Sequence, residues 1–592
     1  MSENDKGKAA RAAFLQGNAD RMADNAAAAR EEAQKNRPPV VCLGAEGNQY
    51  VLYSTEYKRI FRLTAEKLTL PNLRAIAPRA RWEAWLFPER VAAGDEVKRG
   101  ELVEAMQERI LSDCGGKLFD SSRVRSRGVW PDAAGGWVYN AGASCWWIPA
   151  DGGKIEQIDN VRGDYVYSAG VALPFPADTP LSDAEGRELV ELMRARSWMM
   201  PGSGELAAGW KVAAMLAGVM QICPHLWINA PAGTGKTRLK NDISALLGKF
   251  SMTQEGVPTE AAIRQRLNGD AVPVLLDEVE QGDNETSEKK IRNLLDLMRS
   301  ASYGKDPMAK GGADGTPRLF PIKCSFALFS VANSIERAAD SSRCLVLNLK
   351  KYREDEQGKA EKVALWERQD AGRELVQSPA FHGRLIARLL RGLPVLMENI
   401  RALADYLRAL DGVDARRAEL FSVLMACRHS LTSFAPLTPE QMQHAADILR
   451  AYGEQEEHES DSCRCLGVLL GYSLEVYGAG KMSVAEACRM LDGCGDADRR
   501  DAIARALNLA GLRWQNEQAA LQVDPRPGSM KRIYAGTQWS NGKVAAVLAE
   551  GADRRRKGVV GANAAGIYYK SIRLTQGGNP TDCIIIPSAL IF

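Results

Sequence analysis

The stretch HLWINAPAGTGKTRLKNDI, residues 225–243, decides the fold of this 592-residue chain. It opens with an apolar run, residues 225–229, that is typical of a short buried strand, and from Arg238 onward it is typical of a helix. The turn between them is rich in small residues and ends in Lys-Thr. A strand, a glycine-containing turn and a helix in this order predict a loop whose backbone N–H groups surround phosphate oxygens.

The turn matches the phosphate-binding pattern GxxxxGK[ST] except at its first position, where Ala230 replaces glycine. Lys236 is expected to place its charge at the β- and γ-phosphates of ATP, and the hydroxyl of Thr237 is expected to bind Mg²⁺. The residues predicted to contact the nucleotide are Ala230, Pro231, Ala232, Gly233, Thr234, Gly235, Lys236, Thr237 and Arg238.

A second motif, AVPVLLDEVE, follows at residues 271–280. Its apolar strand, 272–276, ends in Asp277 and Glu278, and Asp277 comes 41 residues after Lys236. Asp277 is predicted to hold Mg²⁺, directly or through water, and Glu278 to polarise the water that attacks the γ-phosphate. An Asp-Glu pair after a strand is common, but at this distance after a phosphate loop it indicates ATP hydrolysis.

A third element is an apolar strand at 325–331 that ends near Asn333. Asn333 is predicted either to orient the attacking water or simply to form a turn. Arg343 precedes a further strand, 344–349, where ring-forming ATPases carry an arginine that reaches the nucleotide of a neighbouring subunit. A surface salt bridge is the alternative for Arg343, and Arg337 competes with it for the catalytic role.

The remaining sequence predicts a multidomain α/β chain around this core. A capping box at Ser182 and Glu185 marks a helix start, and 531–536 (KRIYAG) has the pattern of a strand. The expected parts are a flexible or helical arm at 1–38, a strand-rich α/β domain at 39–180, the ATPase core at 181–354, a helical region at 355–458 and a winged-helix-type domain at 459–592.

The composition gives limited information on function, but it bears on nucleic-acid binding, membrane insertion and metal binding. Hydrophobic residues make up 45% and charged residues 26%, and the net charge of +3 is too small to indicate a nucleic-acid partner by itself. No apolar stretch reaches 18 residues, so we expect no membrane span. The twelve cysteines lack CxxC spacing, which favours reduced thiols in a cytoplasmic protein over a metal site. Four tryptophans in the strand-rich region either pack in its core or stack on bases: Trp130, Trp137, Trp146 and Trp147.

The order of these motifs resembles the superfamily-three helicases and the neighbouring AAA+ ATPases. The stretches TEAAIRQRLNGDAVPVLLDEVE and IRNLLDLMRSASYG are similar to the ATPase region of phage and prophage replication proteins of the primase/helicase type. The resemblance covers about residues 205–350 and departs from the family pattern at Ala230. No primase signature occurs, so a priming activity is not implied.

In superfamily-three helicases, a hairpin before the asparagine strand projects into the ring channel and grips the DNA backbone. The resemblance therefore makes Lys305, Lys310 and Arg318, within the glycine-containing segment 304–320, candidates for DNA contacts. A solvated loop is the alternative. A second cationic run would bind a duplex backbone or remain solvated, and it consists of Arg554, Arg555, Arg556 and Lys557.

Together these patterns predict an ATP- and Mg²⁺-dependent DNA motor of the helicase type in the replication of a phage or mobile element. The expected partner is DNA, single-stranded by preference, and the chain is expected to bind it as a homo-oligomeric ring. No membrane partner is expected. Two other functions remain open: an ATP-driven protein remodeller or loader, and a nucleotide-gated assembly in phage defence.

Overall fold

The computed structural model describes residues 37–591 except 232, 280–284, 305–307, 312–316, 321, 331–341, 354, 459–460, 494–495, 535–538, 540–543, 551, 554, 557–558, 564 and 573–579. The predicted arm at 1–38 therefore lies outside the described residues, apart from Arg37 and Pro38. The chain divides into two compact units, Met1–Ile448 and Leu449–Phe592.

Five of the described strands form a parallel sheet at the centre of the first unit. The strands are β11 (His225–Asn229), β12 (Met252–Glu255), β13 (Val274–Asp277), β16 (Phe326–Ser330) and β17 (Cys344–Asn348). Their order across the sheet is β12-β13-β16-β11-β17. Strands β11, β13 and β16 are almost wholly buried, as expected for a parallel sheet covered on both faces. This confirms the mixed α/β architecture predicted from the sequence.

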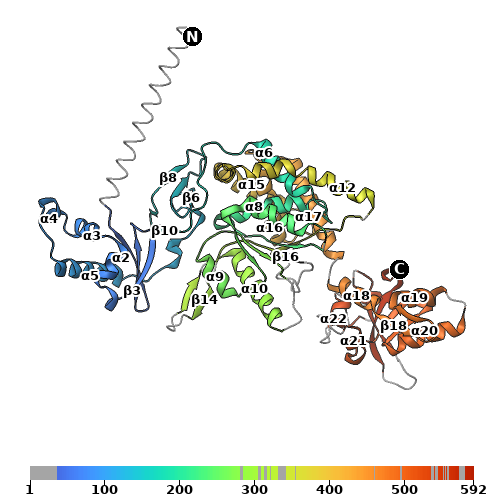
Figure 1. Ribbon diagram of the computed structural model, residues 1–592. Coiled ribbons are helices and arrows are strands. Elements are labelled where there is room, and N and C mark those ends of the chain that lie inside the picture. Colours follow the sequence, from blue (N-terminus) through green and yellow to red (C-terminus); the bar gives the residue numbers. More distant parts are fainter. Residues whose placement is uncertain are drawn as a thin grey trace, which may run out of the picture. The chain divides into compact units, whose positions relative to one another are not determined.

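The helices between these strands follow from the handedness of the crossovers. They are α8 (Lys236–Leu247), α9 (Glu260–Leu267) and α10 (Glu285–Tyr303). The crossover from β11 to β12 runs in the opposite direction to those from β12 to β13 and from β13 to β16, so right-handed connections place α8 on one face and α9 and α10 on the other. Figure 1 shows this arrangement. The direction reverses between β11 and β16, and ligands of such sheets bind beyond the carboxyl ends of the strands at that point.

His225 fixes the start of β11 from inside the core. Its ring nitrogen Nδ1 accepts a hydrogen bond from the backbone N–H of Phe326 at 3.1 Å. Nε2 lies 2.8 Å from the carbonyl oxygen of Met298 and 2.9 Å from Oγ of Ser302. Because Nδ1 must accept, the ring is neutral with its proton on Nε2. Burial lowers the pKa of His225 to about 4.

We therefore expect acid to destabilise the first unit through His225. An unfolded histidine titrates near 6.5, so the folded state loses stability as the pH falls from about 6.5 towards 4. The loss between pH 7 and pH 5 should be about 2 kcal/mol from this group. Urea unfolding of the wild type and of His225→Asn at both pH values measures it. An unchanged pH dependence in the variant would contradict the assignment.

The strand-rich region precedes the core and contains two antiparallel sheets and a small mixed one. Its described strands are β1 (Val40–Glu46), β2 (Gln49–Ser54) and β3 (Arg59–Thr64); β5 (Gly128–Pro131), β6 (Trp137–Asn140), β7 (Cys145–Ile148) and β8 (Glu156–Ile158); and β4 (Val124–Arg125), β9 (Val161–Arg162) and β10 (Tyr165–Tyr167). Helices α2 (Leu70–Ile76), α3 (Arg79–Leu86), α4 (Pro88–Ala93) and α5 (Arg99–Gly115) follow β3. Trp130 and Trp147 pack against the buried cluster around Val138, which favours core packing for these two tryptophans.

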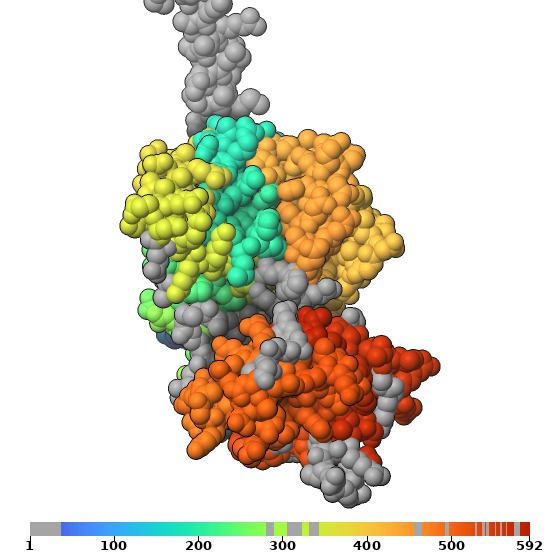
Figure 2. All heavy atoms as spheres, turned by 90° about the vertical axis from the view of Figure 1, so that its right-hand side faces the viewer, coloured from blue at the N-terminus to red at the C-terminus, as the bar shows by residue number. Residues whose placement is uncertain are grey.

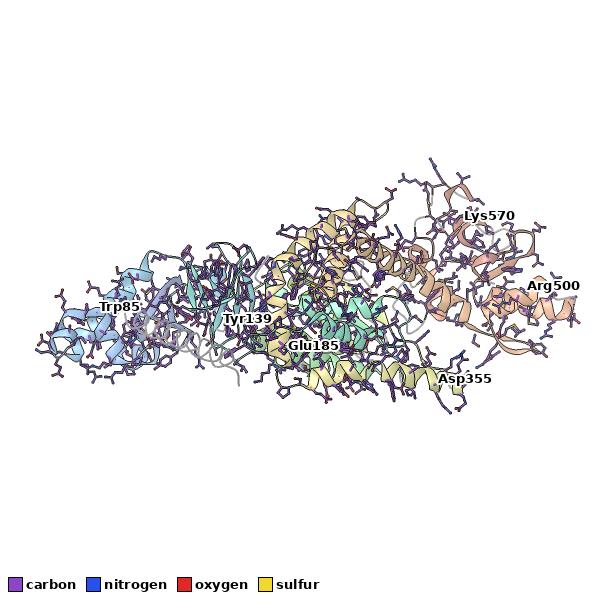
Figure 3. The ribbon with its side chains drawn as sticks, turned by 90° about the horizontal axis from the view of Figure 1, so that it is seen from above. Trp85, Tyr139, Glu185, Asp355, Arg500 and Lys570 are labelled. Carbon is purple, nitrogen blue, oxygen red and sulfur yellow. The ribbon has the colours of Figure 1, made fainter. Side chains whose placement is uncertain are left out.

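Hydrogen bonds and an aromatic contact join the strand-rich region to the part of the chain that carries the parallel sheet. The carboxylate of Asp270 accepts hydrogen bonds from Nε and the backbone N–H of Arg127 at 3.0 and 2.9 Å. Tyr139 stacks on Phe250 with 6.4 Å between the ring centroids, and Figure 3 shows Tyr139 beside the core. Phe250 lies just before β12 and Asp270 lies in the loop before β13. The contacts therefore hold the segments before these two strands against the strand-rich region.

Helices cover the remaining side of the core. They are α6 (Asp183–Arg194), α7 (Ser203–Met215), α12 (Glu356–Glu367), α13 (Asp370–Gln377), α14 (Phe381–Arg391), α15 (Leu393–Arg408) and α16 (Ala415–Ser430). Helix α17 (Pro439–His458) contains the boundary between the two units. The predicted capping box is confirmed, because Ser182 and Glu185 cap α6 reciprocally. Glu185 also pairs with Arg384 at 2.6 and 2.7 Å, which joins α6 to α14 and lowers the pKa of Glu185. Figure 2 shows the α6–α7 segment in turquoise between yellow and orange helices.

The second unit has its own hydrophobic core. Its described elements are α18 (Asp461–Gly471), β18 (Ser473–Val476), β19 (Gly480–Ser483), α19 (Val484–Gly493), α20 (Ala497–Leu509), β20 (Leu512–Gln515), β21 (Ala520–Val523), α21 (Pro527–Ile533), α22 (Val544–Leu548), β22 (Tyr568–Ile572) and β23 (Thr581–Pro587). The strand predicted at 531–536 is wrong, because Ile533 ends helix α21. Pro527 in the first turn favours a helix start, and Met530 and Ile533 bury one face of it.

Candidate nucleotide-binding site

The loop after β11 has the backbone that a phosphate site needs. Gly233 and Gly235 have φ angles of 83° and 93°, a region that favours glycine, and no atom lies within 4 Å of a Cβ added at either position. Conformation therefore explains both glycines, while crowding does not. Ala232 lies outside the described residues.

Ala230 departs from the phosphate-binding pattern without disturbing the loop. It is not among the residues with positive φ, so its methyl group is compatible with the backbone. Its N–H donates to the carbonyl oxygen of Ser330 at 2.9 Å, which ties the start of the loop to β16. Thr234 is buried, and its Oγ1 donates to the carbonyl oxygen of Pro231 at 2.7 Å. The loop is thus closed on itself and anchored to the neighbouring strand.

Helix α8 begins directly at Lys236, so the first-turn N–H groups and the two predicted ATP contacts share one end of the helix. Lys236 is half-buried and Thr237 is exposed. The amides of a helix's first turn lack partners inside the helix and favour anions. The two side chains and these amides therefore offer a phosphate both hydrogen-bond donors and positive charge.

Asp277 lies at the carboxyl end of β13, at the same edge of the sheet as the phosphate loop. Its side chain is largely buried, and both carboxylate oxygens are engaged. Oδ1 accepts a hydrogen bond from the backbone N–H of Glu278 at 3.0 Å. Oδ2 lies 2.6 Å from the ammonium nitrogen of Lys240. Sequence reasoning missed Lys240, although its place one helical turn after Lys236 was a readable signal.

Glu278 is exposed and has a φ of 55°, a left-handed backbone that is rare for a glutamate. The chain returns to the sheet at the next residue, where the N–H of Val279 donates to the carbonyl oxygen of Phe329 at 3.1 Å. Side chains held in such backbone conformations cluster at functional sites. The bend turns the chain out of the strand direction at Glu278, at the edge of the sheet where the predicted phosphate loop begins.

The oxygen donors at this edge fit Mg²⁺ in their chemistry. Mg²⁺ prefers a few carboxylate and hydroxyl oxygens combined with phosphate oxygens and water. Thr237 supplies an exposed hydroxyl and Asp277 a carboxylate. Among the described residues, no group of three or more His, Cys, Asp or Glu side chains could hold a metal ion. A metal bound at Thr237 and Asp277 would therefore take its other ligands from water and from phosphate oxygens.

Asn333 and Arg337 lie outside the described residues, because the described part of the chain stops after Ser330, the last residue of β16, and resumes at residue 342. Two other amides meet at the same edge. Nδ2 of Asn229 donates to Oδ1 of Asn348 at 2.7 Å, which joins the carboxyl ends of β11 and β17. Neither asparagine was predicted to belong to the site.

Arg343 lies at the opposite edge of the sheet. Its carbonyl oxygen accepts a hydrogen bond from the N–H of His225, the first residue of β11. At about 3.3 Å per residue, β11 separates this position from the phosphate loop by roughly 13 Å. The Arg343 guanidinium lies over the ring of Tyr303, 5.8 Å from its centroid. Arg343 therefore does not join the site of its own chain.

Two contacts tie α8 to the helical region. The guanidinium of Arg238 lies over the ring of Trp366 in α12, 4.3 Å from its centroid. Asp242 accepts two hydrogen bonds from Arg373 in α13 at 3.0 and 2.7 Å. A displacement of α12 and α13 would therefore act directly on the helix that begins at Lys236.

The predicted DNA contacts are described only in part. β14 (Met308–Gly311) and β15 (Pro317–Phe320) form an antiparallel hairpin within the segment 304–320. Lys310 is directly opposite Arg318 in its register. Arg555 and Arg556 are exposed. The remaining predicted positions, Lys305, Arg554 and Lys557, lie outside the described residues.

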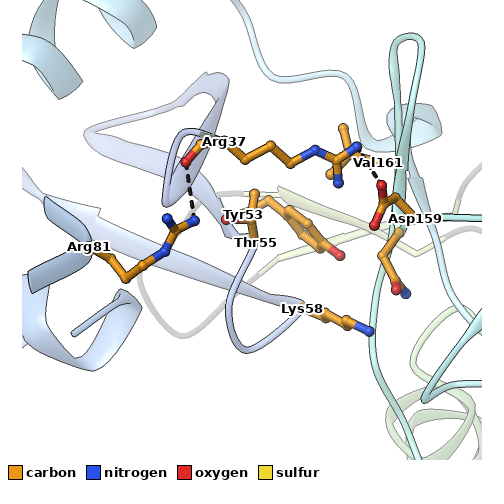
Figure 4. A pocket seen from close by; sticks show the side chains of 8 residues that line it. Arg37, Tyr53, Thr55, Lys58, Arg81, Asp159 and Val161 are labelled. Atoms are coloured by element: carbon orange, nitrogen blue, oxygen red, sulfur yellow. Dashed lines mark hydrogen bonds and ion pairs between the residues drawn. The ribbon is translucent and has the colours of Figure 1, made fainter. Parts of the chain in front are cut away.

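A small pocket in the strand-rich region is lined by eight residues, none of which belongs to the predicted phosphate loop (Figure 4). Arg37 pairs with Asp159 at 2.8 Å, and Arg81 pairs with Glu56 at 2.6 Å. The Arg81 guanidinium also donates to the carbonyl oxygen of Arg37 at 3.2 Å. Because both arginines are neutralised by carboxylates, we assign no anion to this pocket.

Ten cysteines with described side chains are free thiols, nine of them buried and Cys42 half-buried. Within the described part of the chain, no helix is long and apolar enough to cross a membrane.

No protein-family profile and no curated protein matches the chain. Similar solved structures include SCCmec type IV Cch, described as an active helicase, with 11% identity, a TM-score of 0.43, and coverage of 93% of this chain and 94% of that one. The apo C-terminal region of NrS-1 has 10% identity and a TM-score of 0.34, and the match covers 93% of this chain and 96% of that one. A full-length MCM homolog from Methanopyrus kandleri has 13% identity and a TM-score of 0.29, and the match covers 62% of this chain and 93% of that one. At TM-scores below 0.5 we base the functional argument on the site alone.

Proposed function

We propose that this chain is an ATP hydrolase that drives a DNA motor of the helicase type. The observation that carries the proposal is the meeting of the phosphate loop and the Asp277–Glu278 pair at one edge of the parallel sheet, beside the point where the strand order reverses. Ligand sites of such sheets lie there. The resemblance in sequence suggests a role in the replication of a phage or mobile element.

Each residue has a separate task in this proposal. Lys236 and the first amides of α8 bind the β- and γ-phosphates, and Glu278 polarises the attacking water from outside the strand. Thr237 and Asp277 would hold Mg²⁺, which neutralises charge on the phosphates. Asn333 remains a predicted positioning residue for the water.

The experiment that tests the proposal is ATP turnover with and without DNA. A DNA motor should hydrolyse ATP slowly alone and faster with single-stranded DNA. Stimulation by a protein partner but by no DNA would favour a remodeller or loader instead. ATP binding without turnover would contradict the enzyme and favour a nucleotide-gated assembly.

The register of the β14–β15 hairpin supports a DNA contact. Lys310 and Arg318 are directly opposite each other, so the two cationic positions share one face of the ladder. Like charges in such a pair repel and destabilise a hairpin. A phosphate between them would remove that repulsion. We propose that this hairpin binds the backbone of single-stranded DNA, and Lys305 remains a predicted contact in the sequence before it.

We expect the triple variant Lys305→Ala, Lys310→Ala and Arg318→Ala to bind single-stranded DNA more weakly at any sequence. The slope of log affinity against log salt should flatten by about one unit per lost phosphate contact. Basal ATP turnover should persist, because no phosphate-site group changes, while DNA stimulation should fall.

A matched control removes the same charges elsewhere. Lys289, Lys290 and Arg292 are exposed on α10, and their triple alanine variant also loses two lysines and one arginine. It should keep the wild-type salt slope. Equal slopes for both triple variants would mean that the hairpin is only solvated and would favour the protein-remodelling function.

We also propose that the second unit contains a winged-helix-type module for duplex DNA. Its support is the succession of α19, α20 and the β20–β21 hairpin. α20 exposes Arg499, Arg505 and Asn508, side chains suited to phosphates and base edges. The exposed Arg555 and Arg556 are further candidates for backbone contacts.

A further inference from the structure

Lys240 has no task in the proposed hydrolysis, yet it holds the carboxylate expected to bind the metal. Its ammonium nitrogen is 2.6 Å from Oδ2 of Asp277. The Lys240 side chain is 16% exposed and that of Asp277 is 12% exposed. Pairs this buried are screened far less by salt and water than surface pairs. The contact is therefore a strong local restraint on Asp277.

The contact also leaves Asp277 no oxygen without a partner. Oδ1 accepts from the N–H of Glu278, so Lys240 occupies the other oxygen. Lys240 follows Lys236 by one helical turn, and residues four apart share a helix face. The first turns of α8 therefore carry two lysines on one face, and the second of them contacts the carboxylate of Asp277 on β13.

An ammonium and a divalent cation compete for the same carboxylate oxygen, because like charges repel across a few ångströms. Without nucleotide, the Lys240 ammonium already neutralises Asp277, and a dication gains little by entering. The triphosphate adds negative charge at Lys236 and Thr237. That negative charge allows the Lys240 ammonium and a divalent metal ion to be present at the site together.

We propose that Lys240 is an internal cation that keeps Asp277 from binding a divalent metal until the nucleotide is present. This rests on the proposed function, in which Asp277 serves the metal. Lys240 is then a positioning residue that makes metal binding depend on nucleotide. A merely structural pair between α8 and β13 would lack this effect on metal affinity.

The test measures binding of Mn²⁺, a probe for Mg²⁺, to the full chain without nucleotide, by the spin-resonance signal of free Mn²⁺. We expect Lys240→Gln to bind Mn²⁺ at least about tenfold more tightly than the wild type, since a competing charge is removed. Adding Asp277→Asn should abolish the gain. Lys240→Met is a second neutral variant, and melting curves report whether each variant folds.

The matched control is Lys249→Gln, which removes the same charge from an exposed lysine just after α8. It should leave Mn²⁺ affinity at the wild-type value. Equal affinities for the wild type and the folded neutral Lys240 variants would overturn the proposal, as would a gain that survives Asp277→Asn. Because no nucleotide is present, these outcomes do not depend on ATP hydrolysis. Failure of the proposed function would appear separately, as a lack of ATP turnover by the wild type with and without DNA.

Discussion

Glu278→Gln should bind ATP and Mg²⁺ like the wild type and lose turnover by about 10²-fold or more, because the water loses its base while the phosphate contacts remain. Glutamine keeps the length of the side chain, and it faces the same left-handed backbone at φ 55°. The exposed position means that no buried charge is removed. Binding of a fluorescent ATP analogue and release of phosphate measure the two effects separately.

Lys236→Ala provides the contrast. It removes the charge at the start of α8, so nucleotide binding itself should fall. A Glu278→Gln enzyme with wild-type turnover would remove Glu278 from its catalytic role. Loss of binding in Glu278→Gln, matching that of Lys236→Ala, would instead mean that Glu278 contributes to the nucleotide pocket.

Arg343→Ala should bind ATP normally and hydrolyse it poorly, with a loss of about 10³-fold if the arginine completes a neighbour's site. Its place at the amino edge of the sheet keeps it from the phosphate loop of its own chain. That geometry makes any catalytic role depend on a second subunit. Turnover and analogue binding are compared at a concentration where light scattering reports the oligomer.

Mixing two inactive variants tests whether sites are shared. An Arg343→Ala subunit keeps an intact phosphate loop, and a Lys236→Ala subunit keeps its Arg343. In random 1:1 rings about one interface in four would combine both intact parts, so the mixture should regain activity that neither variant has. A protein that stays monomeric with ATP and shows full turnover would rule this role out. Normal melting of Arg343→Ala excludes damage to its packing over Tyr303.

The strand, turn and helix around the predicted phosphate loop could be read from the sequence because their determinants are local. A strand, two glycines at positive φ and a helix that begins at Lys236 lie within 19 consecutive residues. The strand that ends at Asp277 was predictable for the same reason, since it is a short apolar run. The capping box at Ser182 was also set by residues three apart.

The strand predicted at 531–536 failed because a short apolar pattern does not distinguish a strand from one face of a helix. Pro527 and the burial of Met530 and Ile533 against the second unit's core decided for the helix. Similarly, the glycine pattern gave no reason why Ala230 is acceptable. The φ angles of the folded loop supply it.

By itself, therefore, the sequence determined the chemistry at the ends of individual strands and helices, where neighbouring residues set the backbone. Only the tertiary structure decided which of those ends meet. The pair of Lys240 and Asp277 joins residues 37 apart, the amides of Asn229 and Asn348 are 119 apart, and Arg343 lies at the far edge of the same sheet. The strand order β12-β13-β16-β11-β17 places them, and that order results from burying the strands β11, β13 and β16 together, which no local pattern encodes.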